Sequence, residues 1–533
     1  MNFLIQSTTL NYKINHKMAL YLKELYPGSK FGVIISAHGE KEKYLKEQNE
    51  LEYEFIYDYQ NIEKGFLAEE YSLDELKKFE ETLPEKSLWR IIAMDRYFGS
   101  AFCKGGSKYQ DTRQLLNGKI CREEVLRVVS GYIKFINKIL DRLKPDVVIF
   151  FPGNHTMMTP ILEQCCKNLN ILHMALDSSK IEDNYMITES TRLVFPQVEE
   201  MYKRIIKNEI SADITIGKRC YDEMLQSVSE NKGYSYHHKM VVGILSGLSE
   251  KRDNPKPYIL LFARTLISTI LDWYKNRASH KKRGKDISIY GIKYFFYNLR
   301  QRLELSYQSR KLLSKKLYDQ YDPDVKYLYF PLTGQPEYAT QVANNMWINQ
   351  LTIIEALAKS IPIDWVIYVK DHPGTIGWRV RPLSYYKELR EYPNVKLIPV
   401  DLNGANIIKN SEMVVTIAST SGWEAVALYN KPVINFSRSV YNVTGLAVQC
   451  TDLTLLSRLI HDEYDRINKI SIMERRKRIV VLINALLMNS VSIDNPLATF
   501  SLRNLEGFTD DILESNAKKL AGFFKQHIDS SSR

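Results

Sequence analysis

Residues 406–436 read NIIKNSEMVVTIASTSGWEAVALYNKPVINF and give the clearest indication of the fold class. Their two apolar runs, Met413–Ala418 and Pro432–Phe436, have the length and composition of buried strands. A polar STSG segment and a helical stretch, Trp423–Leu428, lie between them. A buried strand, a helix and a second buried strand in this order indicate a βαβ unit with parallel strands.

The same alternation of strands and helices runs through both halves of the chain. The second half adds the strand candidates Tyr327–Leu332, Asp364–Lys370 and Asn394–Val400, and the first half adds Phe31–Ser36, Val147–Phe151 and Ile171–Leu176. A long amphipathic helix over Glu123–Leu143 precedes one of these strands. We therefore expect an α/β protein with two doubly wound, Rossmann-like domains facing a cleft.

A chain of 533 residues is long enough for two such domains. We expect an N-terminal α/β domain over residues 1–256 and a C-terminal α/β domain over residues 324–491. A basic, aromatic connector over residues 257–323 would join them. A helical segment over residues 492–533 would pack back on the first domain.

Cysteine usage and the start of the chain predict a cytoplasmic protein. The six cysteines form no CxxC pair and no regular framework, which fits a reducing compartment and argues against a structural zinc site. The opening residues, MNFLIQSTTL, lack the basic leader and long apolar core of a signal peptide.

The net charge of +11 is concentrated in the connector. Residues 275–316 contain 13 Lys or Arg and two acidic residues, which accounts for the whole excess. They follow an apolar, aromatic run, Tyr258–Tyr274, which is short for a membrane span. Aromatic residues beside basic ones suit an anionic membrane surface, although a solvated helix pair packed on the protein fits equally well. Nucleic acid is not expected as a partner, because no recognition motif accompanies the charge.

The segment Lys370-Asp371-His372-Pro373 stands at the end of a predicted strand. Ligands of parallel α/β domains bind at the carboxyl ends of strands. A histidine there can donate to a phosphate oxygen or protonate a leaving group, and Lys370 adds a positive charge nearby. A histidine in an ordinary turn would give the same pattern.

A second motif, Ser419-Thr420-Ser421-Gly422-Trp423-Glu424, follows a strand and opens a helix. Hydroxyls and free backbone N–H groups at a helix N-terminus suit a nucleotide phosphate. Glu424 could bind ribose hydroxyls. The alternatives are a plain N-cap and a carboxylate placed favourably in the first helical turn.

Three segments in this order resemble the capsular-polysaccharide biosynthesis family: YLYFPLTGQPE (Tyr327–Glu337), YVKDHP (Tyr368–Pro373) and residues 406–436. That family includes GT-B transferases that move Kdo, an eight-carbon acidic sugar, from its CMP-activated form. Bacterial sialyltransferases share a looser version of the motifs. The resemblance implies a GT-B-like glycosyltransferase of capsule or lipopolysaccharide synthesis with a CMP-sugar donor, no further cofactor and no metal. No DxD-type motif stands at a plausible strand end.

The resemblance also implies roles for individual residues. His372 would contact the donor phosphate and assist the departure of CMP. Ser419, Thr420 and Ser421 would hold that phosphate, and Glu424 would contact the ribose. Glu337 would face the cleft. An acceptor, either lipid-linked or an oligosaccharide, would be met at the inner face of the cytoplasmic membrane if the protein associates with it peripherally.

The first half of the chain matches the family less well. The segment LDSSKIEDNYMITE (Leu176–Glu189) stands where the family carries an acidic segment that ends in Thr and Glu. The family's glycine-tyrosine and arginine-proline elements are missing, so the catalytic carboxylate stays open among Asp177, Glu182, Asp183 and Glu189. Such a group would activate an acceptor hydroxyl or attack the sugar.

His155 is a further catalytic candidate, because it follows the predicted strand Val147–Phe151. Two other functions also fit the sequence. One is a CDP-polyol phosphotransferase, which would release CMP while transferring phosphorus to the acceptor. The other is a non-catalytic polysaccharide assembly or binding protein, which would tolerate the loss of His372.

Overall fold

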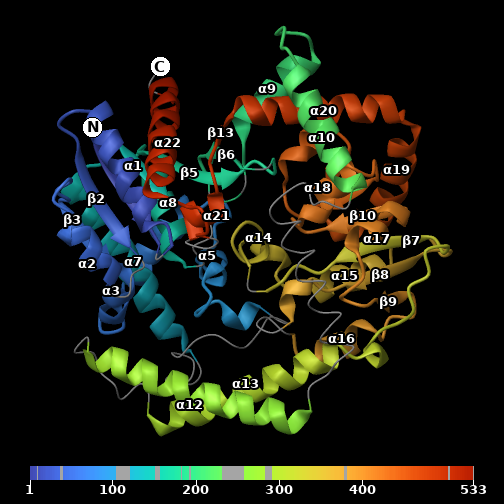
Figure 1. The fold of residues 1–533 in the computed structure, drawn as a ribbon, viewed down its shortest axis with the longest axis horizontal. Helices are drawn as coiled ribbons and strands as arrows, with labels where there is room; N and C mark the ends of the chain where they lie inside the picture. Colours follow the sequence, from blue (N-terminus) through green and yellow to red (C-terminus); the bar gives the residue numbers. More distant parts are fainter. Residues whose placement is uncertain are drawn as a thin grey trace. The chain divides into compact units, whose positions relative to one another are not determined.

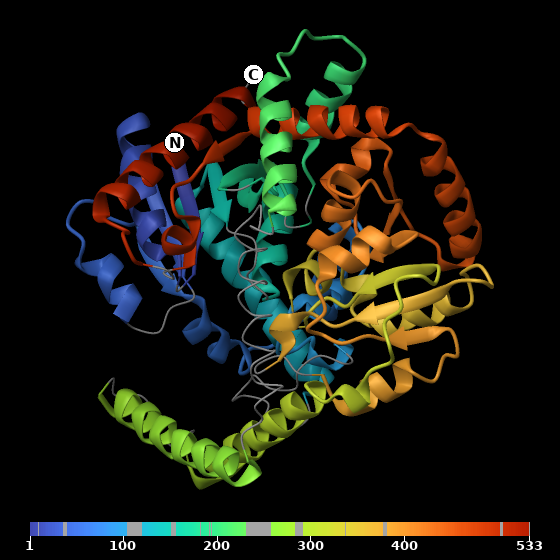
Figure 2. The same ribbon diagram turned by 45° about the vertical axis from the view of Figure 1, so that its right-hand side comes forward.

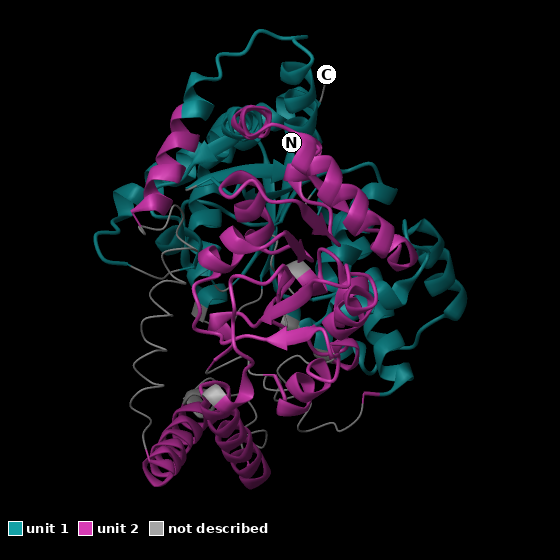
Figure 3. Ribbon diagram, turned by 90° about the vertical axis from the view of Figure 1, so that its right-hand side faces the viewer, with its two compact units in different colours: residues 1–95, 121–218, 481–533 teal, residues 96–120, 219–480 magenta. Residues whose placement is uncertain are grey.

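The computed structural model describes residues 1–8, 10–35, 40–103, 120–150, 156–181, 183–190, 192, 194–230, 257–282, 291–335, 337–376, 381–501 and 505–531. The chain forms two compact units (Figure 3). Unit 1 comprises Met1–Asp95, Cys121–Lys218 and Val481–Arg533, and unit 2 comprises Arg96–Ile120 and Arg219–Val480.

The boundaries of the units differ from the expected domain boundaries. The chain passes into unit 2 inside helix α10 (Thr215–Ser229) and returns to unit 1 inside helix α20 (Ile472–Met488). Unit 1 therefore contains both ends of the chain. The change of composition near residue 257 marks the start of a helical pair within unit 2, and the units do not separate there.

The sheet of unit 1 has the strand order β13-β6-β5-β4-β1-β2-β3 (Figure 1). The strands are β1 (Asn2–Ser7), β2 (Lys30–Ile35), β3 (Phe55–Asp58), β4 (Val147–Phe150), β5 (Leu172–Ser178), β6 (Asn184–Thr188) and β13 (Ser490–Ser492). β1 to β5 are parallel, whereas β6 runs antiparallel to β5, and β13 runs antiparallel to β6. The parallel part has the order 3-2-1-4-5, which is that of a doubly wound sheet.

Helices cover this sheet and extend from it. They are α1 (Tyr12–Leu25), α2 (Glu40–Glu47), α3 (Tyr59–Phe66), α4 (Leu73–Thr82), α5 (Leu88–Met94), α7 (Arg122–Leu143), α8 (Met158–Asn168), α9 (Pro196–Ile206), α21 (Pro496–Ser501) and α22 (Asp510–Ser531). The last helix, α22, packs along α1 (Figure 1). Buried Leu520 and Phe524 join Ile14 and Met18 in one apolar cluster, and Tyr21 donates to Glu514 at 3.0 Å.

The sheet of unit 2 consists entirely of parallel strands in the order β12-β11-β10-β7-β8-β9. The strands are β7 (Tyr327–Pro331), β8 (Val366–Lys370), β9 (Val395–Leu397), β10 (Met413–Thr416), β11 (Val433–Asn435) and β12 (Ala447–Gln449). Numbered in chain order this is 6-5-4-1-2-3, the order of a Rossmann fold. The predicted α/β class with two doubly wound, Rossmann-like domains is confirmed.

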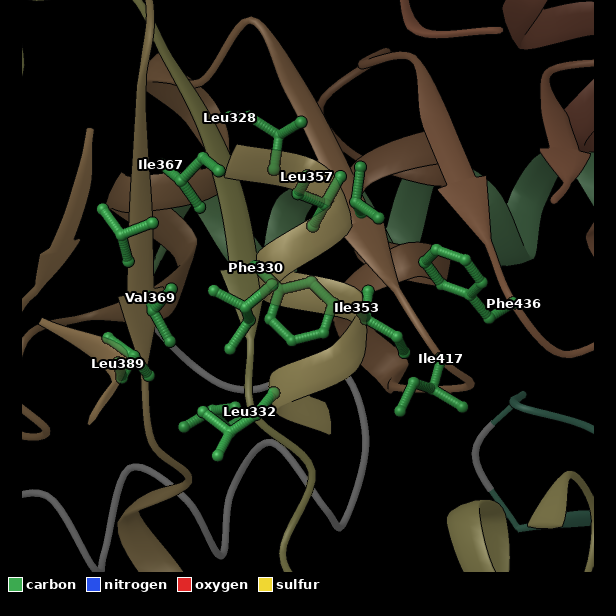
Figure 4. Packing of buried hydrophobic residues seen from close by; sticks show 14 of the residues in the cluster. Leu328, Phe330, Leu332, Ile353, Leu357, Ile367, Val369, Leu389, Ile417 and Phe436 are labelled. Atoms are coloured by element: carbon green, nitrogen blue, oxygen red, sulfur yellow. The ribbon is translucent and has the colours of Figure 1, made fainter. Parts of the chain in front are cut away.

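Unit 2 packs its helices around a core of alternating strand residues. The helices are α12 (Tyr258–Lys282), α13 (Ile292–Leu312), α14 (Tyr338–Gln341), α15 (Gln350–Ala358), α16 (Leu383–Leu389), α17 (Gly404–Asn410), α18 (Thr420–Ala427) and α19 (Leu456–Lys469). Leu328 and Phe330 of β7 point with Ile367 and Val369 of β8 toward Ile353 of α15 (Figure 4). Alternate residues share one face of a strand, which leaves Tyr329 and Lys370 on the opposite face.

Within the described residues, no helix combines the length and the apolar composition that crossing a bilayer requires.

Leu520→Ala should lower the free energy of unfolding by about 2–5 kcal/mol, because it leaves a cavity where a buried leucine was. Leu520 is fully buried on α22, and Lys518 is exposed on the same helix, so Lys518→Ala is the matched control. Urea unfolding followed by circular dichroism measures the difference. Equal midpoints for the two variants would show that α22 is not part of the core of unit 1.

Candidate functional site

The three motifs of the second half follow three neighbouring strands of unit 2. β10 lies beside β7, and β7 lies beside β8. The register pairs Val414 with Tyr329 and Pro331 with Lys370, so the three strands end at the same level. β7 and β10 flank the point where the strand order reverses, and doubly wound sheets bind their ligands at this point.

Asp371, directly after β8, is buried and held by three donors. Its Oδ1 accepts from the backbone N–H of His372 at 2.8 Å. Its Oδ2 accepts from Arg381 Nε at 3.2 Å and from the Tyr386 hydroxyl at 2.5 Å. Burial and the charge of Asp371 raise the pKa of Tyr386 well above its usual value, so the phenol keeps its proton and remains a donor. Asp371 therefore supports the loop that carries His372.

Arg381 ties this loop to the one after β7. Its guanidinium is fully buried and donates to the backbone carbonyl of Thr333 and, at 3.2 Å, to Oε1 of Gln335. Burial disfavours the charged guanidinium, but attraction to Asp371 outweighs this effect and raises the pKa of Arg381 above its usual value. Gln335 in turn donates to the backbone carbonyl of Ile348. One buried cation thus fixes two of the three motif loops to each other.

His372 is exposed at the end of this supported loop. Its Nδ1 accepts from the backbone N–H of Gly374 at 3.0 Å, and its backbone carbonyl accepts from the Thr375 hydroxyl at 2.7 Å. Because Nδ1 must be unprotonated to accept, the neutral ring carries its proton on Nε2. His372 can therefore donate to an anion from Nε2 while the ring keeps its contact with the loop.

Lys370, the last residue of β8, is buried. Burial lowers the pKa of its ammonium group to about 8, although Asp371 and Glu424 attract the charge. Because Glu424 of α18 acts on this charge, the Lys370 side chain lies near the first turns of α18. An anion bound near this lysine would replace part of its lost hydration and favour the protonated form.

The N-terminus of α18 carries the hydroxyls of the third motif. Ser419 is the N-cap residue: its Oγ accepts from the backbone N–H of Ser421 at 3.1 Å, and its own N–H donates to the Thr416 hydroxyl at 3.1 Å. Thr420 is exposed and Ser421 is half-buried. Ser419 thus has the capping role that the sequence left open, while the helix terminus as a whole still favours an anion.

Gly422 determines how closely α18 approaches the sheet. A Cβ atom at this position would lie 2.3 Å from the hydroxyl oxygen of Tyr441 and 2.9 Å from Cγ2 of Thr416. Any side chain would therefore push the first turn of α18 away from the end of β10. Trp423, which follows, is fully buried and anchors the helix.

The two glutamates of the motifs are both half-buried. Glu424 on α18 attracts the charge of Lys370, and together with burial it raises the pKa of Tyr329 on β7. It is therefore close to the carboxyl ends of β7 and β8. Glu337 occupies the N-cap position of α14, where its side chain makes no capping hydrogen bond. The neighbouring Pro336 lies outside the described residues.

Asp177 belongs to unit 1 and stands at the carboxyl end of β5. Its Oδ1 accepts from the backbone N–H of Ser178 at 2.7 Å, and its Oδ2 is buried with no hydrogen-bond partner among the described residues. Burial raises the pKa of Asp177, although Lys180 and the Ser178 N–H favour the charged form. A carboxylate with a raised pKa and an oxygen that lacks a hydrogen-bond partner is a candidate for proton transfer.

Glu189 is not brought together with Asp177. The predicted acidic segment forms a hairpin in which β6 returns antiparallel to β5, with Thr188 opposite Ala175. Glu189 therefore follows β6 toward the amino end of β5. At about 3.3 Å per residue it lies roughly 10 Å along the strand from Asp177.

Hydrogen bonds from His527 and Gln197 hold the Glu189 carboxylate at this position. The carboxylate accepts from His527 Nε2 at 3.2 Å and from Gln197 at 3.3 Å. The hydrogen bond from His527 is the main reason that the pKa of Glu189 is lowered, against the effect of burial. These contacts attach α22 and α9 to the edge of the sheet.

The remaining candidates of the first half contribute less. Asp183 adopts a left-handed backbone conformation (φ 59°) in the hairpin, and its carbonyl accepts from the N–H of Ile493 at 2.8 Å. His155 and Glu182 lie outside the described residues.

Sequence reasoning did not identify Arg381 and Tyr386. Neither belongs to a recognisable motif, and Arg379 stands near enough in the chain to be an equal candidate. The one available signal is Asp371, since a carboxylate next to a buried strand end requires a buried partner. Among the described residues, no three His, Cys, Asp or Glu side chains are grouped as metal ligands.

Comparison with known proteins finds one family. Residues 327–458 match the model of a family described as capsule polysaccharide biosynthesis protein. The matched range contains all three motifs of unit 2, from the loop after β7 to α18. No curated protein matches the chain.

Solved structures that resemble the chain are remote from it. The UDP-GlcNAc 2-epimerase of Methanocaldococcus jannaschii is 12% identical, with a TM-score of 0.24, and the match covers 92% of this chain and 100% of that one. KpsC of Thermosulfurimonas dismutans, a beta Kdo 2,4 transferase, is 11% identical, with a TM-score of 0.35 and coverages of 69% and 87%. The kitacinnamycin glycosyltransferase is 10% identical, with a TM-score of 0.26 and coverages of 98% and 98%. The fold assignment rests on the strand orders, and unit 2 is similar over residues 327–458 to the capsule polysaccharide biosynthesis family.

Proposed function

We propose that the chain is a glycosyltransferase of bacterial capsule or lipopolysaccharide synthesis that transfers an acidic, Kdo-like sugar from a CMP-activated donor, without a metal. One observation carries the proposal. The His372 loop, the Glu337 loop and the N-terminus of α18 meet at the strand ends beside the reversal of strand order, within the residues that match the capsule family. Three loops that each present groups suited to a phosphate or a ribose favour a nucleotide.

In this proposal, the donor phosphate lies between the His372 ring and the first turn of α18. Nε2 of His372 donates to a phosphate oxygen, and Thr420 with the free N–H groups of the helix contributes further donors. Lys370, the last residue of β8, supplies positive charge. Glu424 accepts hydrogen bonds from ribose hydroxyls. Donors that are already held in place stabilise the charge that develops on the departing phosphate.

The transfer breaks the bond between the anomeric carbon and the phosphate oxygen, and CMP leaves with the electron pair. The acceptor oxygen forms the new bond, and its proton must pass to a base. We assign this role to Asp177, because its pKa is raised and its Oδ2 has no hydrogen-bond partner among the described residues. Glu189 is the weaker candidate, since His527 and Gln197 already occupy its carboxylate.

The proposal places the enzyme in the cytoplasm, peripherally at the inner face of the cytoplasmic membrane. A lipid-linked or oligosaccharide acceptor would be presented there, and the six cysteines all remain free thiols, as in a reducing compartment.

The purified protein should bind CMP in the presence of a chelator, because all the proposed phosphate contacts come from the chain itself. Titration calorimetry with CMP, UMP and GMP, each with and without EDTA, measures the dissociation constants. Binding that EDTA abolishes, or tighter binding of UMP or GMP, would contradict the proposed donor.

His372→Ala should lower kcat by about two to four powers of ten while the fold is kept, since a positioned donor or acid is lost from an exposed loop. His461→Ala, which changes an exposed histidine on α19, is the matched control. Ser419→Ala and Thr420→Ala should mainly weaken CMP binding. Near-normal turnover of folded His372→Ala with CMP-Kdo would leave the histidine as a turn residue.

CMP affinity should fall as the pH rises through about 8, because the ammonium group of Lys370 then loses its proton. The protonated form prevails below this pKa and attracts the phosphate, so the dissociation constant should rise by up to about tenfold per pH unit above it. Calorimetry between pH 7 and pH 9 tests this expectation. In Lys370→Met the affinity should be lower and independent of pH. An unchanged pH profile in this variant would assign the effect to another group.

A further inference from the structure

Helices α12 and α13 form a hairpin whose polarity is inverted relative to that of a helix pair in water. Figure 1 and Figure 2 show the two helices side by side. Both helices bury polar side chains: Thr269 is fully buried, and Thr265 and Asn298 are 8% and 9% exposed. An edge-to-face contact between Trp273 and Phe295, with ring centroids 5.7 Å apart, also joins the two helices. A helix pair that packs in water normally buries its apolar stripe at this position.

The polar groups inside the hairpin satisfy each other. Arg302 of α13 forms an ion pair with Asp272 of α12 at 2.5 Å and donates to Oδ1 of Asn298 at 3.2 Å. The Thr265 and Thr269 hydroxyls donate to backbone carbonyls one turn earlier, at 2.7 Å each. The buried Thr265, Thr269 and Asn298 therefore have hydrogen-bond partners within the hairpin, whereas the Asp272 carboxylate of the ion pair stays partly exposed to solvent.

The outer surface of the hairpin carries a cluster of exposed apolar side chains, beside exposed charged ones such as Arg264 and Arg300. The exposed fractions are 77% for Ile259, 57% for Leu260, 58% for Ile267, 54% for Leu271, 70% for Ile292 and 62% for Phe296. Single exposed apolar residues are common on protein surfaces, whereas a cluster of this kind marks an interaction site. Among the described residues, unit 2 presents no comparable cluster on any other helix.

We infer that the α12–α13 hairpin inserts its apolar outer surface into the boundary between headgroups and acyl chains of an anionic bilayer. In an apolar medium, a helix pair must satisfy the hydrogen bonds of its polar groups internally and present apolar side chains on the outside. Neither helix is long and apolar enough to cross the bilayer, so the hairpin lies at its surface.

The positive charge of the hairpin favours an anionic lipid surface as the partner of its apolar side chains. Residues 275–316 hold the whole excess of +11, and exposed Lys275 and Lys293 stand on the two helices. Anionic headgroups attract basic side chains beside an apolar segment. A second copy of the chain would bring an equal positive charge to the same surface, and repulsion between the two would oppose that contact.

The inference deepens the proposed function, because it names the surface at which a lipid-linked acceptor would be met. Contact with lipid is nevertheless independent of turnover. Vesicle binding and CMP binding can be measured separately on the same protein, so the failure of one proposal is distinguishable from the failure of the other.

The test is flotation of the full chain with vesicles of phosphatidylglycerol and phosphatidylethanolamine, compared with vesicles of phosphatidylcholine alone. The apolar-face variant carries Ile267→Gln, Leu271→Gln and Phe296→Gln. The matched control removes three exposed apolar side chains elsewhere in unit 2 and carries Ile363→Gln, Ile472→Gln and Met473→Gln. A charge variant carries Lys281→Gln, Lys282→Gln, Arg283→Gln and Lys285→Gln.

The native chain and the matched control should float with anionic vesicles and not with neutral ones. The apolar-face variant should bind at least about tenfold more weakly, since each exposed apolar side chain that enters lipid favours binding, and its affinity for CMP should be unchanged. The charge variant should also lose affinity. If the apolar-face variant bound anionic vesicles as tightly as the native chain, the contact with lipid would be electrostatic adsorption only. That result would contradict the proposed insertion of apolar side chains.

Two further outcomes would overturn the inference. One is a native chain that stays in the bottom fraction at low salt with anionic vesicles. The other is measured by light scattering in the absence of lipid. If the native chain were a dimer and the apolar-face variant a monomer, the apolar surface would contact a second copy of the chain.

Discussion

The buried ion pair between Asp371 and Arg381 is the constraint on which the candidate site depends. A guanidinium and a carboxylate removed from water are tolerated only when their hydrogen bonds are satisfied, and here Tyr386, Thr333 and Gln335 complete them. Loss of one partner from such a pair typically costs about 3–5 kcal/mol. Because the pair spans the loops after β7 and β8, the position of the exposed His372 follows from two buried charges.

The different roles of Lys370, Asp371 and His372 follow from this buried ion pair. The hydrogen bonds of Asp371 hold the loop in place, whereas the neutral His372 ring carries its proton on Nε2 and can donate it to a ligand. Burial lowers the pKa of Lys370, so its ammonium group loses the proton more readily than that of an exposed lysine. The same contrast appears in unit 1, where Glu189 accepts hydrogen bonds from its partners and Oδ2 of Asp177 has no partner among the described residues. Carboxylates of equal chemistry thus have unequal reactivity, because their surroundings differ.

Most parallel strands could be predicted from sequence because burial on both faces makes them continuous apolar runs, as in Met413–Ala418. The pattern missed β1, a central strand whose apolar run is cut short by the polar Gln6 and Ser7. It also missed the antiparallel β6 and the edge strand β13, where pairing with a neighbour outweighs composition. The motif at Ser419 indicated the start of a helix, but only the structure shows that the Ser419 side chain caps it. Arg381 was beyond prediction, since its contacts join residues more than forty positions apart.

The composition of unit 1 from three separate stretches bears on the order in which the protein is made. A ribosome releases the N-terminal strands long before α22, yet Leu520 and Phe524 of that helix complete the apolar cluster around α1. Most of unit 2 is one continuous stretch, Arg219–Val480, and can fold on the nascent chain. The apolar surface of α1 stays exposed until α22 has also been synthesised. A segment that is made early is therefore stabilised late, and chaperones have long access to it.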